Sequence, residues 1–392
     1  MDRVVDENNY LKTDYGVKDH KFIILGSYSA NVLGQIRGLG ERGIKPIGVL
    51  VHKNTFRIDK SKYLAKVHSV NTITEGLDLV LRVYGHENHK PFLYTDMDSA
   101  MALFDERFDE LNDKFYVWNA GGNGKLRMLL NKYEQFKLAQ ECGIKIPKTE
   151  YVRVGELPKT LNYPIFTKAV DSLNPYWKGN AYICHTEEEL KQAYEKMDME
   201  YILLQEYIVK KDELPIEGIS LRGGDEIVLL GRTVSYRLQE DSFGTYRYVE
   251  PFSNPELELK IKQLIKRFQY TGAFEIEFLI NQDGTECYLE TNFRIAQQNY
   301  AYVMLGANIP YLYAIFTLSG HIVEEEIQYV EKRKINIMHE FEDFKICVLN
   351  KKTSLLRWIK DVHSADCFSF YNKWDKLPFF YTLLEKIKTH IL

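Results

Sequence analysis

Residues 272–294 read GAFEIEFLINQDGTECYLETNFR, and the fold of the chain follows from this stretch. Two runs of alternating apolar and polar residues flank Asp283-Gly284, a dipeptide that strongly indicates a two-residue hairpin turn. Because successive side chains of a strand point to opposite faces of its sheet, each run has one apolar and one polar face. The pattern predicts a β-hairpin whose apolar face lies on a protein core.

The register of this hairpin follows by counting outward from the turn. The predicted pairs are Gln282 with Thr285, Phe278 with Leu289, Glu277 with Glu290, and Glu275 with Asn292. The apolar faces of the two runs then coincide, as a core on one side of the sheet requires. The residues expected on the polar face of the second run are Tyr288, Glu290, Asn292 and Arg294.

Two carboxylates oppose each other in this register. The Cβ atoms of Glu277 and Glu290 would lie about 5 Å apart, and like charges at that spacing destabilise a hairpin. A cation between them removes the repulsion, and carboxylate oxygens together with the Asn292 amide oxygen are ligands that Mg²⁺ prefers. Arg294 continues the same face and can neutralise phosphate oxygens. The alternative is a solvated acidic face, which leaves Asn292 and Arg294 unexplained.

A glutamate on one strand followed by Glu-x-Asn-x-Arg on the next resembles the metal-binding core of the ATP-grasp superfamily. The resemblance implies that Glu277, Glu290 and Asn292 bind Mg²⁺, with two ions expected and Mn²⁺ as a substitute. Members of this superfamily join a carboxylate to an amine, using ATP and an acyl phosphate intermediate. The resemblance therefore implies a ligase with ATP and Mg²⁺ as cofactors and small-molecule carboxylate and amine substrates.

The start of the chain shows a βαβ pattern. Residues 21–25 form an apolar strand, residues 32–39 a helix and residues 46–51 a second strand, which together predict a parallel sheet. The loop over residues 26–30 lies where a dinucleotide-binding fold holds a pyrophosphate, but it lacks the G-x-G-x-x-G motif. A degenerate domain of this kind in front of the catalytic part is what the resemblance implies.

The predicted fold class is therefore α/β, with a Rossmann-like N-terminal domain, an ATP-grasp fold and a C-terminal extension. The expected divisions are a polar segment over 1–20, the Rossmann-like domain over 21–125, a small ATP-grasp subdomain over 126–205, a large subdomain over 206–321, and the extension over 322–392. Within the extension, residues 374–379 (WDKLPF) resemble a tail of the D-aspartate-ligase-like branch.

The resemblance also implies phosphate-binding lysines. Lys132 lies in a helix predicted over residues 126–142, which ends in the Gly-Ile-x-x-Pro pattern of the superfamily. Lys168 ends the strand predicted over residues 163–168 and corresponds to the lysine that binds the α- and β-phosphates. Without the resemblance, each would be read as a solvated lysine.

The flap that covers ATP in the superfamily corresponds to residues 171–180, DSLNPYWKGN, with a single glycine. Since glycines allow backbone N–H groups to approach phosphate, the single glycine of this stretch departs from the pattern that favours those backbone contacts. Ser172 and Lys178 are the candidates to replace them.

Residues 205–208 (QEYI) resemble the linker that holds adenine, which assigns Glu206, Tyr207 and Ile208 to the base. Glu213 has the spacing of the ribose-binding glutamate. Asp212 and Glu217 are alternatives, since all three lie in a predicted acidic loop over 212–217.

Two further arginines are candidate catalytic residues beside Arg294. Residues 227–237 predict a strand pair around Gly231 that brings Arg232 and Arg237 to one region. Two guanidinium groups can clamp a carboxylate or the transferring phosphoryl group.

The composition argues against several classes of protein, including nucleic-acid-binding and zinc-binding proteins. The net charge of -4 over 392 residues argues against nonspecific binding of nucleic acid. The five cysteines do not have the spacing of a zinc site. An odd, dispersed set of cysteines indicates reduced thiols, as in a cytosolic protein. Residues 1–20 do not resemble a signal peptide, and the longest apolar run, 309–319, is too short to span a bilayer. We expect a cytoplasmic protein without a transmembrane segment, and a homodimer is compatible with the sequence.

Two other functions remain open at this point. One is phosphoryl transfer that stops before ligation, as in a kinase. The other is a nucleotide-binding regulatory module of ATP-grasp fold, which the glycine-poor flap over residues 171–180 favours.

Overall fold

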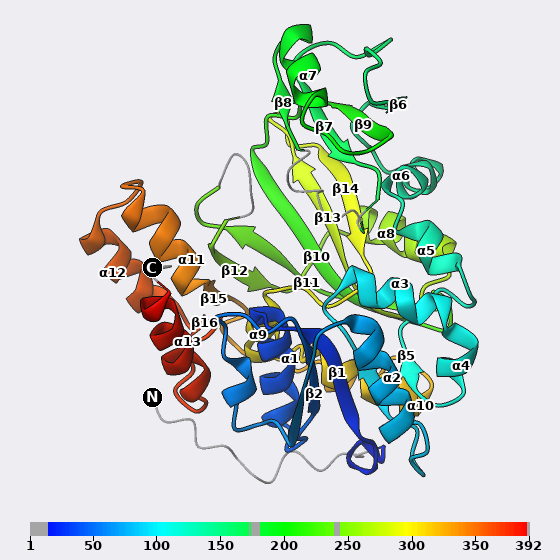
Figure 1. Cartoon of the computed structure of the whole chain (residues 1–392), viewed down its shortest axis with the longest axis vertical. Coiled ribbons are helices and arrows are strands. Elements are labelled where there is room, and N and C mark those ends of the chain that lie inside the picture. The colour runs from blue at the N-terminus through cyan, green and yellow to red at the C-terminus, as the bar shows by residue number, and fades with distance from the viewer. Residues whose placement is uncertain (1–14, 172, 174–180, 239–243, 390–392) are drawn as a thin grey trace.

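The computed structural model describes residues 15–171, 173, 181–238 and 244–389. Three sheets organise these residues (Figure 1), with a parallel sheet at the bottom of the view, a large sheet in the centre and a small antiparallel sheet at the top. The α/β class and the parallel front sheet predicted from the sequence are confirmed.

The N-terminal domain contains a five-stranded parallel sheet in the order β3-β2-β1-β4-β5. Its strands are β1 (Phe22–Ser27), β2 (Ile47–Val51), β3 (Lys66–Val70), β4 (Phe92–Tyr94) and β5 (Tyr116–Val117). Its helices are α1 (Ala30–Gly40), α2 (Ile73–Tyr84), α3 (Asp98–Glu106) and α4 (Phe108–Asn112), with short 3-10 turns η1 (Val17–Asp19) and η2 (Ile58–Lys60). Strands β1 and β2 are almost fully buried, which explains their continuous apolar runs.

A carboxylate occupies the loop between β1 and α1. Asp96 accepts hydrogen bonds from the backbone N–H of Ser27 at 2.9 Å and from the hydroxyls of Ser27 and Ser29 at 2.6 Å each. In a dinucleotide-binding loop, donors at this position would bind the phosphate. Here they bind Asp96, which agrees with the absence of the G-x-G-x-x-G motif.

The small sheet is antiparallel, in the order β6-β9-β7-β8. Its elements are β6 (Thr149–Arg153), β7 (Ile165–Ala169), β8 (Ile183–Cys184), α7 (Glu187–Tyr194) and β9 (Tyr201–Glu206). It has a small core of its own around Ile165, Leu190 and Ile202.

The helix predicted over residues 126–142 is two helices, α5 (Lys125–Leu129) and α6 (Lys132–Glu141). Asn131 interrupts them because its side-chain oxygen caps α6, accepting from the N–H of Tyr133 at 2.9 Å and of Glu134 at 3.4 Å. Lys132 is therefore the first residue of α6, and not an interior helical residue.

The large sheet has seven strands in the order β14-β13-β10-β11-β12-β15-β16. Its strands are β10 (Asp212–Leu221), β11 (Glu226–Ser235), β12 (Tyr246–Glu250), β13 (Gly272–Ile280), β14 (Glu286–Asn292), β15 (Ile335–Met338) and β16 (Cys367–Phe368). Helices α8 (Pro255–Phe268), α9 (Asn299–Leu305) and α10 (Ile309–Ser319) and the turn η4 (Glu324–Glu326) accompany it. Among the described residues no single helix could span a membrane by length and composition, and only α9 with α10, bent by 71°, passes that test as a pair.

Two sequence expectations for this sheet are wrong. The acidic loop expected over residues 212–217 is the start of β10, whose buried leucine and isoleucine side chains hold it between β11 and β13. The strand pair expected around Gly231 is one continuous strand, β11. Gly231 does not turn the chain; it lets Tyr302 and the backbone of Glu250 approach, since an added Cβ would lie 2.7 and 2.6 Å from them.

The hairpin turn is one residue longer than the sequence predicts. Asn281 and Thr285 close the turn, with a backbone N–H···O bond of 3.1 Å from Asn281 to Thr285. Gly284 takes a φ of 89°, the left-handed conformation that a three-residue hairpin loop requires. Gln282 therefore belongs to the turn and is not paired with Thr285 as expected.

A β-bulge at Leu289 compensates for the longer turn. Phe278 pairs with Tyr288, whereas Glu277 pairs with Glu290, so Leu289 is the extra residue on β14. Tyr288 consequently lies on the core face, fully buried, and its hydroxyl donates to Gln135 at 2.6 Å. The predicted Phe278–Leu289 pair is wrong, while the Glu277–Glu290 and Glu275–Asn292 pairs are confirmed.

The C-terminal extension completes the large sheet. Strand β15 pairs antiparallel with β12, and β16 pairs parallel with β15. Helices α11 (Glu340–Asp343), α12 (Leu355–Ser364) and α13 (Leu377–Lys388), with the π-helical turn η5 (Phe344–Leu349), cover this end of the molecule, at the left of Figure 1.

A buried ion pair joins the extension to the N-terminal domain. Arg37 of α1 is fully buried; its Nε lies 3.2 Å from Asp375 Oδ2, and its Nη2 donates to the carbonyl of Phe370 at 2.6 Å. Asp375 also accepts from Ser61 Oγ at 2.8 Å and from the N–H of Lys62 at 3.0 Å. The N-terminal domain and the C-terminal extension are thus held together.

We expect Arg37→Met to lower the free energy of unfolding by about 3–5 kcal/mol, because it leaves the Asp375 carboxylate buried without its cation. Urea unfolding measures the change, with the exposed Lys373→Met as a control that should match the parent. A parental unfolding midpoint for Arg37→Met would contradict a structural role for the pair.

Candidate active site

One face of the large sheet gathers carboxylates from neighbouring strands. Glu217 of β10 lies opposite Glu275 of β13, and Glu275 lies opposite Asn292 of β14. One row further along, Glu277 of β13 lies opposite Glu290 of β14. Directly paired residues share a face of a sheet, so these side chains form one acidic surface.

Two lysines from other elements reach this surface. Glu290 Oε2 lies 2.5 Å from Lys132 Nζ and 3.1 Å from Lys168 Nζ. Lys168 also donates to the carbonyl of Leu289 at 3.0 Å, so it binds at the bulge. Burial raises the pKa of Glu290, but the two lysines outweigh burial and hold this pKa below its ordinary value. Glu290 is therefore ionised and shared between two cations.

Local structure explains why the lysines converge. The backbone N–H of Lys132 donates to the carbonyl of Val170 at 2.9 Å, and Asn131 forms a β-bridge with Asp171. These bonds fix the start of α6 beside the end of β7, where Lys168 lies. The order of the two lysines along the chain was the basis for predicting phosphate contacts, and the structure brings them within reach of one carboxylate.

The neighbouring carboxyl groups are in a different state. Burial raises the pKa of Glu277 well above its ordinary value, and the charges of Glu275 and Glu290 raise it further. Burial, and then Glu275, likewise raise the pKa of Glu217. Lys168 lowers the pKa of Glu277 and Arg294 lowers that of Glu217, but burial and the neighbouring carboxylates outweigh these cations.

Asn292 binds the two glutamates of β13. Its Nδ2 donates to Glu277 at 2.8 Å and to Glu275 at 3.2 Å, and its Oδ1 accepts from Arg294 at 3.3 Å. Among the described residues no three acidic, histidine or cysteine side chains converge as a preformed metal site. Glu277, Glu290 and Asn292 nevertheless supply hard oxygen donors on adjacent positions of one face, so the donor set fits Mg²⁺ once the amide turns its oxygen toward the carboxylates.

Arg294 is held by the N-terminal domain. Its Nε lies 2.9 Å from Oδ1 of Asp98, the first residue of α3. Burial lowers the pKa of Arg294, but Asp98 and then Glu275 outweigh burial and raise it above its ordinary value. The front domain thus contributes a carboxylate that orients a candidate catalytic residue.

The other two predicted arginines do not join this surface. Arg232 pairs with Ile216 and Glu250, which places it on the opposite face of the sheet, where it forms an ion pair with Glu250 at 2.6 Å. Arg237 binds both carboxylate oxygens of Asp343, at 2.8 and 2.7 Å, and also contacts Asp361. The expected clamp of Arg232 and Arg237 is therefore wrong for this structure, because strand alternation separates Arg232 from the acidic surface.

Arg247 is the cation that the sequence interpretation missed. Arg247 belongs to β12 and lies opposite Ser235 of β11, on the same face as the carboxylates. It is 7% exposed. Burial lowers the pKa of Arg247, and Glu213, Glu275 and Glu277 oppose this change. Gln298 connects Arg247 to Glu275: its side-chain oxygen accepts from Arg247 at 3.4 Å, and its side-chain nitrogen donates to Glu275 at 2.8 Å.

The signals for these residues in the sequence are unequal. Glu275 lies on the same predicted polar face as Glu277, two residues away, so it could have been included among the candidate site residues. Arg247 lies within the short stretch 246–250 (YRYVE), but nothing in that stretch distinguishes it from a solvated arginine.

The adenine and ribose candidates surround the junction of β9 and β10. Glu206 accepts from the N–H of Lys148 at 2.9 Å, and the N–H of Tyr207 donates to the carbonyl of Pro164 at 3.2 Å. Glu213 is buried and binds Lys210 at 2.7 Å and Ser235 at 3.2 Å. Their roles, and that of Ile208, stay predictions. Ser172 and Lys178 lie outside the described residues.

No protein-family model and no curated protein matches this sequence. Solved structures do match the fold. An L-amino acid ligase from Bacillus licheniformis is 17% identical, with a TM-score of 0.62 over 81% of this chain and 79% of that one. The biotin carboxylase domain of a 2-oxoglutarate carboxylase from Hydrogenobacter thermophilus, solved with MgADP, ADP and bicarbonate, is 18% identical, with a TM-score of 0.61 over 79% and 72%.

A carboxyaminoimidazole ribonucleotide synthase from Aspergillus clavatus, solved with ATP, is 14% identical, with a TM-score of 0.59 over 80% of each chain. These similarities establish the ATP-grasp fold for this chain. The D-aspartate-ligase-like branch is not specifically indicated by them.

The pKa shifts at the acidic surface predict a pH dependence of stability. A carboxyl group whose pKa is higher in the folded than in the unfolded chain stabilises the fold at low pH and loses that contribution as pH rises. The free energy of unfolding of the metal-free protein should therefore fall above about pH 4.3, by at most about 1.4 kcal/mol per pH unit for each such group. Glu277→Gln should make this fall shallower, as measured by urea unfolding in EDTA between about pH 5 and 8.

The exposed Glu188→Gln is the matched control and should keep the parental slope. Glu290→Gln should instead lower the free energy of unfolding by about 3 kcal/mol, because it removes the anion between two buried lysines. Equal slopes for Glu277→Gln and the parent would show that Glu277 is already ionised in the folded protein.

Proposed function

We propose that this chain is an ATP-dependent ligase that joins a small-molecule carboxylate to an amine through an acyl phosphate. The observation that carries the proposal is the position of Glu290 between Lys132 and Lys168, on the same sheet face as Glu277 and Asn292. The similar structures solved with ATP or MgADP support nucleotide binding by this fold.

Glu277, Glu290 and Asn292 would hold Mg²⁺, with two ions as the proposed number and Mn²⁺ as a substitute. The ion, when bound, offsets the charge of the phosphate oxygens and of the carboxylates themselves. Lys132 and Lys168 exchange their shared partner Glu290 for phosphate oxygens, since a metal-bound Glu290 is a weaker partner for them. Residues 206–208 would hold adenine, and Glu213 would hold ribose.

The chemistry then has two steps. A carboxylate oxygen of the first substrate attacks the terminal phosphorus of ATP, the bond to the bridging oxygen breaks, and ADP leaves. The amine nitrogen attacks the acyl carbon, phosphate leaves, and the nitrogen loses a proton. Arg294 and Arg247, which lie at the acidic surface, would stabilise the negative charge that develops on the oxygens in each step. The substrate supplies the nucleophile, so no activated serine or cysteine is needed.

A cytoplasmic location and a homodimer are further parts of the proposal. One of the similar structures is described as a domain dimer, which supports the second.

MgATP should raise the melting temperature of the protein, because a ligand that binds only the folded state stabilises it. ADP release should then depend on both an amino-acid or related carboxylate and an amine, tested with a panel of each. ADP formation that needs no amine would indicate phosphoryl transfer alone. Binding of MgATP without turnover across the panel would indicate a regulatory nucleotide-binding module.

Lys168→Ala and Arg294→Ala should have different effects. Lys168 would bind phosphates that do not react, so its loss should mainly weaken nucleotide binding. Arg294 would bind nearer the transferring phosphoryl group, so its loss should lower kcat. The activation free energy should rise by about 2.7–4 kcal/mol, the usual size of a lost transition-state contact. Nucleotide titrations and kcat measured together distinguish the two. Equal losses of ATP affinity in both variants, with turnover kept, would contradict these roles.

A further inference from the structure

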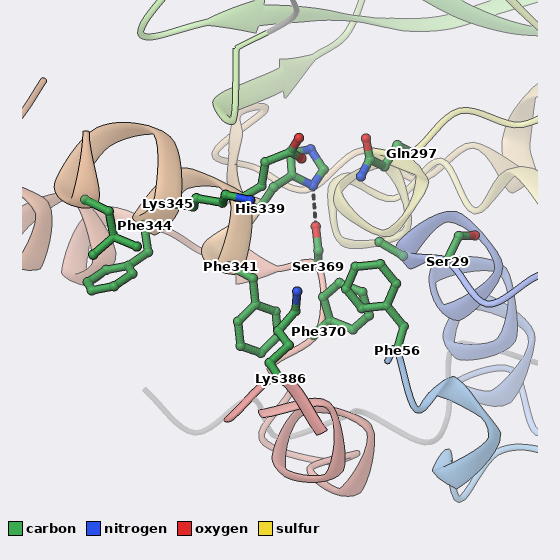
Figure 2. A pocket seen from close by; sticks show the side chains of 13 residues that line it. Ser29, Phe56, Gln297, His339, Phe341, Phe344, Lys345, Ser369, Phe370 and Lys386 are labelled. Carbon is green, nitrogen blue, oxygen red and sulfur yellow. Dashed lines mark hydrogen bonds between the residues drawn. The ribbon is translucent and has the colours of Figure 1, made fainter. Parts of the chain in front are cut away.

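A cavity of about 340 Å³ lies where the three parts of the chain meet. The N-terminal domain contributes Ser29 and Phe56, the large sheet region contributes Gln297, and the extension contributes Phe341 and Lys386. Figure 2 shows these side chains around the open space, with Phe341, Phe370 and Lys386 on its lower side and Gln297 and His339 above.

The cavity borders the acidic surface. Gln297 lines it, and the next residue, Gln298, binds both Glu275 and Arg247. His339 also lines the cavity; it follows β15, which pairs with the strand of Arg247. A molecule in the cavity therefore has one end close to the groups proposed to perform the chemistry.

His339, which lines this end, has a buried polar atom that is unused. It is 4% exposed, its Nδ1 bonds to Ser369, and its Nε2 is buried without a hydrogen-bond partner among the described residues. Burial, with a smaller contribution from Arg247, lowers the pKa of His339 to about 3, so the ring is neutral. A neutral imidazole with a free buried nitrogen is a costly arrangement unless a ligand group binds it.

Lys386 presents an unused cation at the other end. The residue is 9% exposed, and its side chain lies between Phe341 and Phe370 in Figure 2. In the part of the chain that the structure describes, no carboxylate forms an ion pair with it and no acceptor binds its Nζ. The Nζ atom lies 4.9 Å from the ring centre of Phe56 and 5.4 Å from that of Phe341.

These rings do not replace the lost hydration of an ammonium group. Burial lowers the pKa of Lys386, the positive charge of Lys345 lowers it further, and Glu342 only partly opposes them. Two ammonium groups beside one carboxylate leave an excess of positive charge at an apolar wall. An anion in the cavity would offset this excess and pair with Lys386 at low dielectric.

We propose that this cavity binds the carboxylate substrate, a small organic anion with an apolar or aromatic body. A second anionic group pairs with Lys386, the body packs against Phe56, Phe341 and Phe370, and the reacting carboxylate lies at the end formed by Gln297 and His339. That this ligand is the substrate rests on the proposed ligase function; that the cavity binds such an anion does not.

Binding without nucleotide tests the site directly. The probes are two dicarboxylates, phenylsuccinate and 4-carboxyphenylacetate, and three monocarboxylates, phenylacetate, 3-phenylpropionate and 4-phenylbutyrate, which supply only the group that pairs with Lys386. Each is compared by calorimetry with its neutral amide. At least one anion should bind the parent about 10- to 100-fold more tightly than its amide, the preference expected from one charge-assisted hydrogen bond. Lys386→Met should lose that preference, and the exposed Lys360→Met should keep it.

Lys386→Met should also melt at or above the parental temperature, because methionine fills the same space without a buried charge. This result separates lost binding from lost folding. Equal affinity for anions and amides, retained preference in Lys386→Met, or no binding by any probe would each overturn the proposal.

The link to catalysis has its own readout. If the carboxylate panel yields a substrate, Lys386→Met should raise its KM about 10-fold or more and leave the KM of ATP unchanged. An unchanged KM for that carboxylate would show that the cavity is not the substrate site. Anion binding that persists when no carboxylate supports ATP turnover would contradict the proposed ligase, while the cavity assignment would stand.

Discussion

The ion cluster of Glu290, Lys132 and Lys168 is the interaction on which the site depends. It joins α6, the small sheet and the large sheet through one carboxylate oxygen, at 2.5 and 3.1 Å from the two ammonium groups. Each of these ions alone would pay a large desolvation cost, so the three elements are held in register by the need to keep them together. The same cluster holds the two lysines beside the carboxylates of β13, where a charged ligand would exchange partners with them.

The acidic surface is closed by parts of the chain that are distant in sequence. Asp98 of the front domain holds Arg294, and Arg37 of α1 binds Asp375 of the extension. The front domain, whose β1–α1 loop is occupied by Asp96, thus borders the acidic surface through Asp98. The extension adds His339 and Lys386, so residues far from the hairpin in the sequence set much of the chemical character of the cavity.

The bulge at Leu289 shows how the hairpin meets two demands at once. Tyr288 must reach Gln135 in the core, while Glu290 must face the lysines. With strict alternation these residues, two apart, would share a face. One extra residue moves Tyr288 to the opposite face and gives Lys168 a carbonyl to bind at 3.0 Å. Bulges near active sites commonly redirect a side chain in this way.

The sequence by itself determined the α/β class, the parallel front sheet, and the facing pair of Glu277 and Glu290. These follow from local periodicity and from the crowding of like charges, which are properties of short segments. The placement of Lys132 and Lys168 near one another was also predictable, but only through the ordered resemblance to a known fold.

Only the tertiary structure decided which arginines face the carboxylates. Arg232, Arg237 and Arg247 look alike in the sequence, yet pairing of β11 with β12 sends Arg232 to the far face and Arg247 to the near one. Likewise the acidic run over 212–217 became a buried strand because β11 and β13 supplied its backbone partners on both sides. The physical reason is the same in each case: a side chain's face, burial and charge state depend on strands far away in the chain, and no local pattern encodes them.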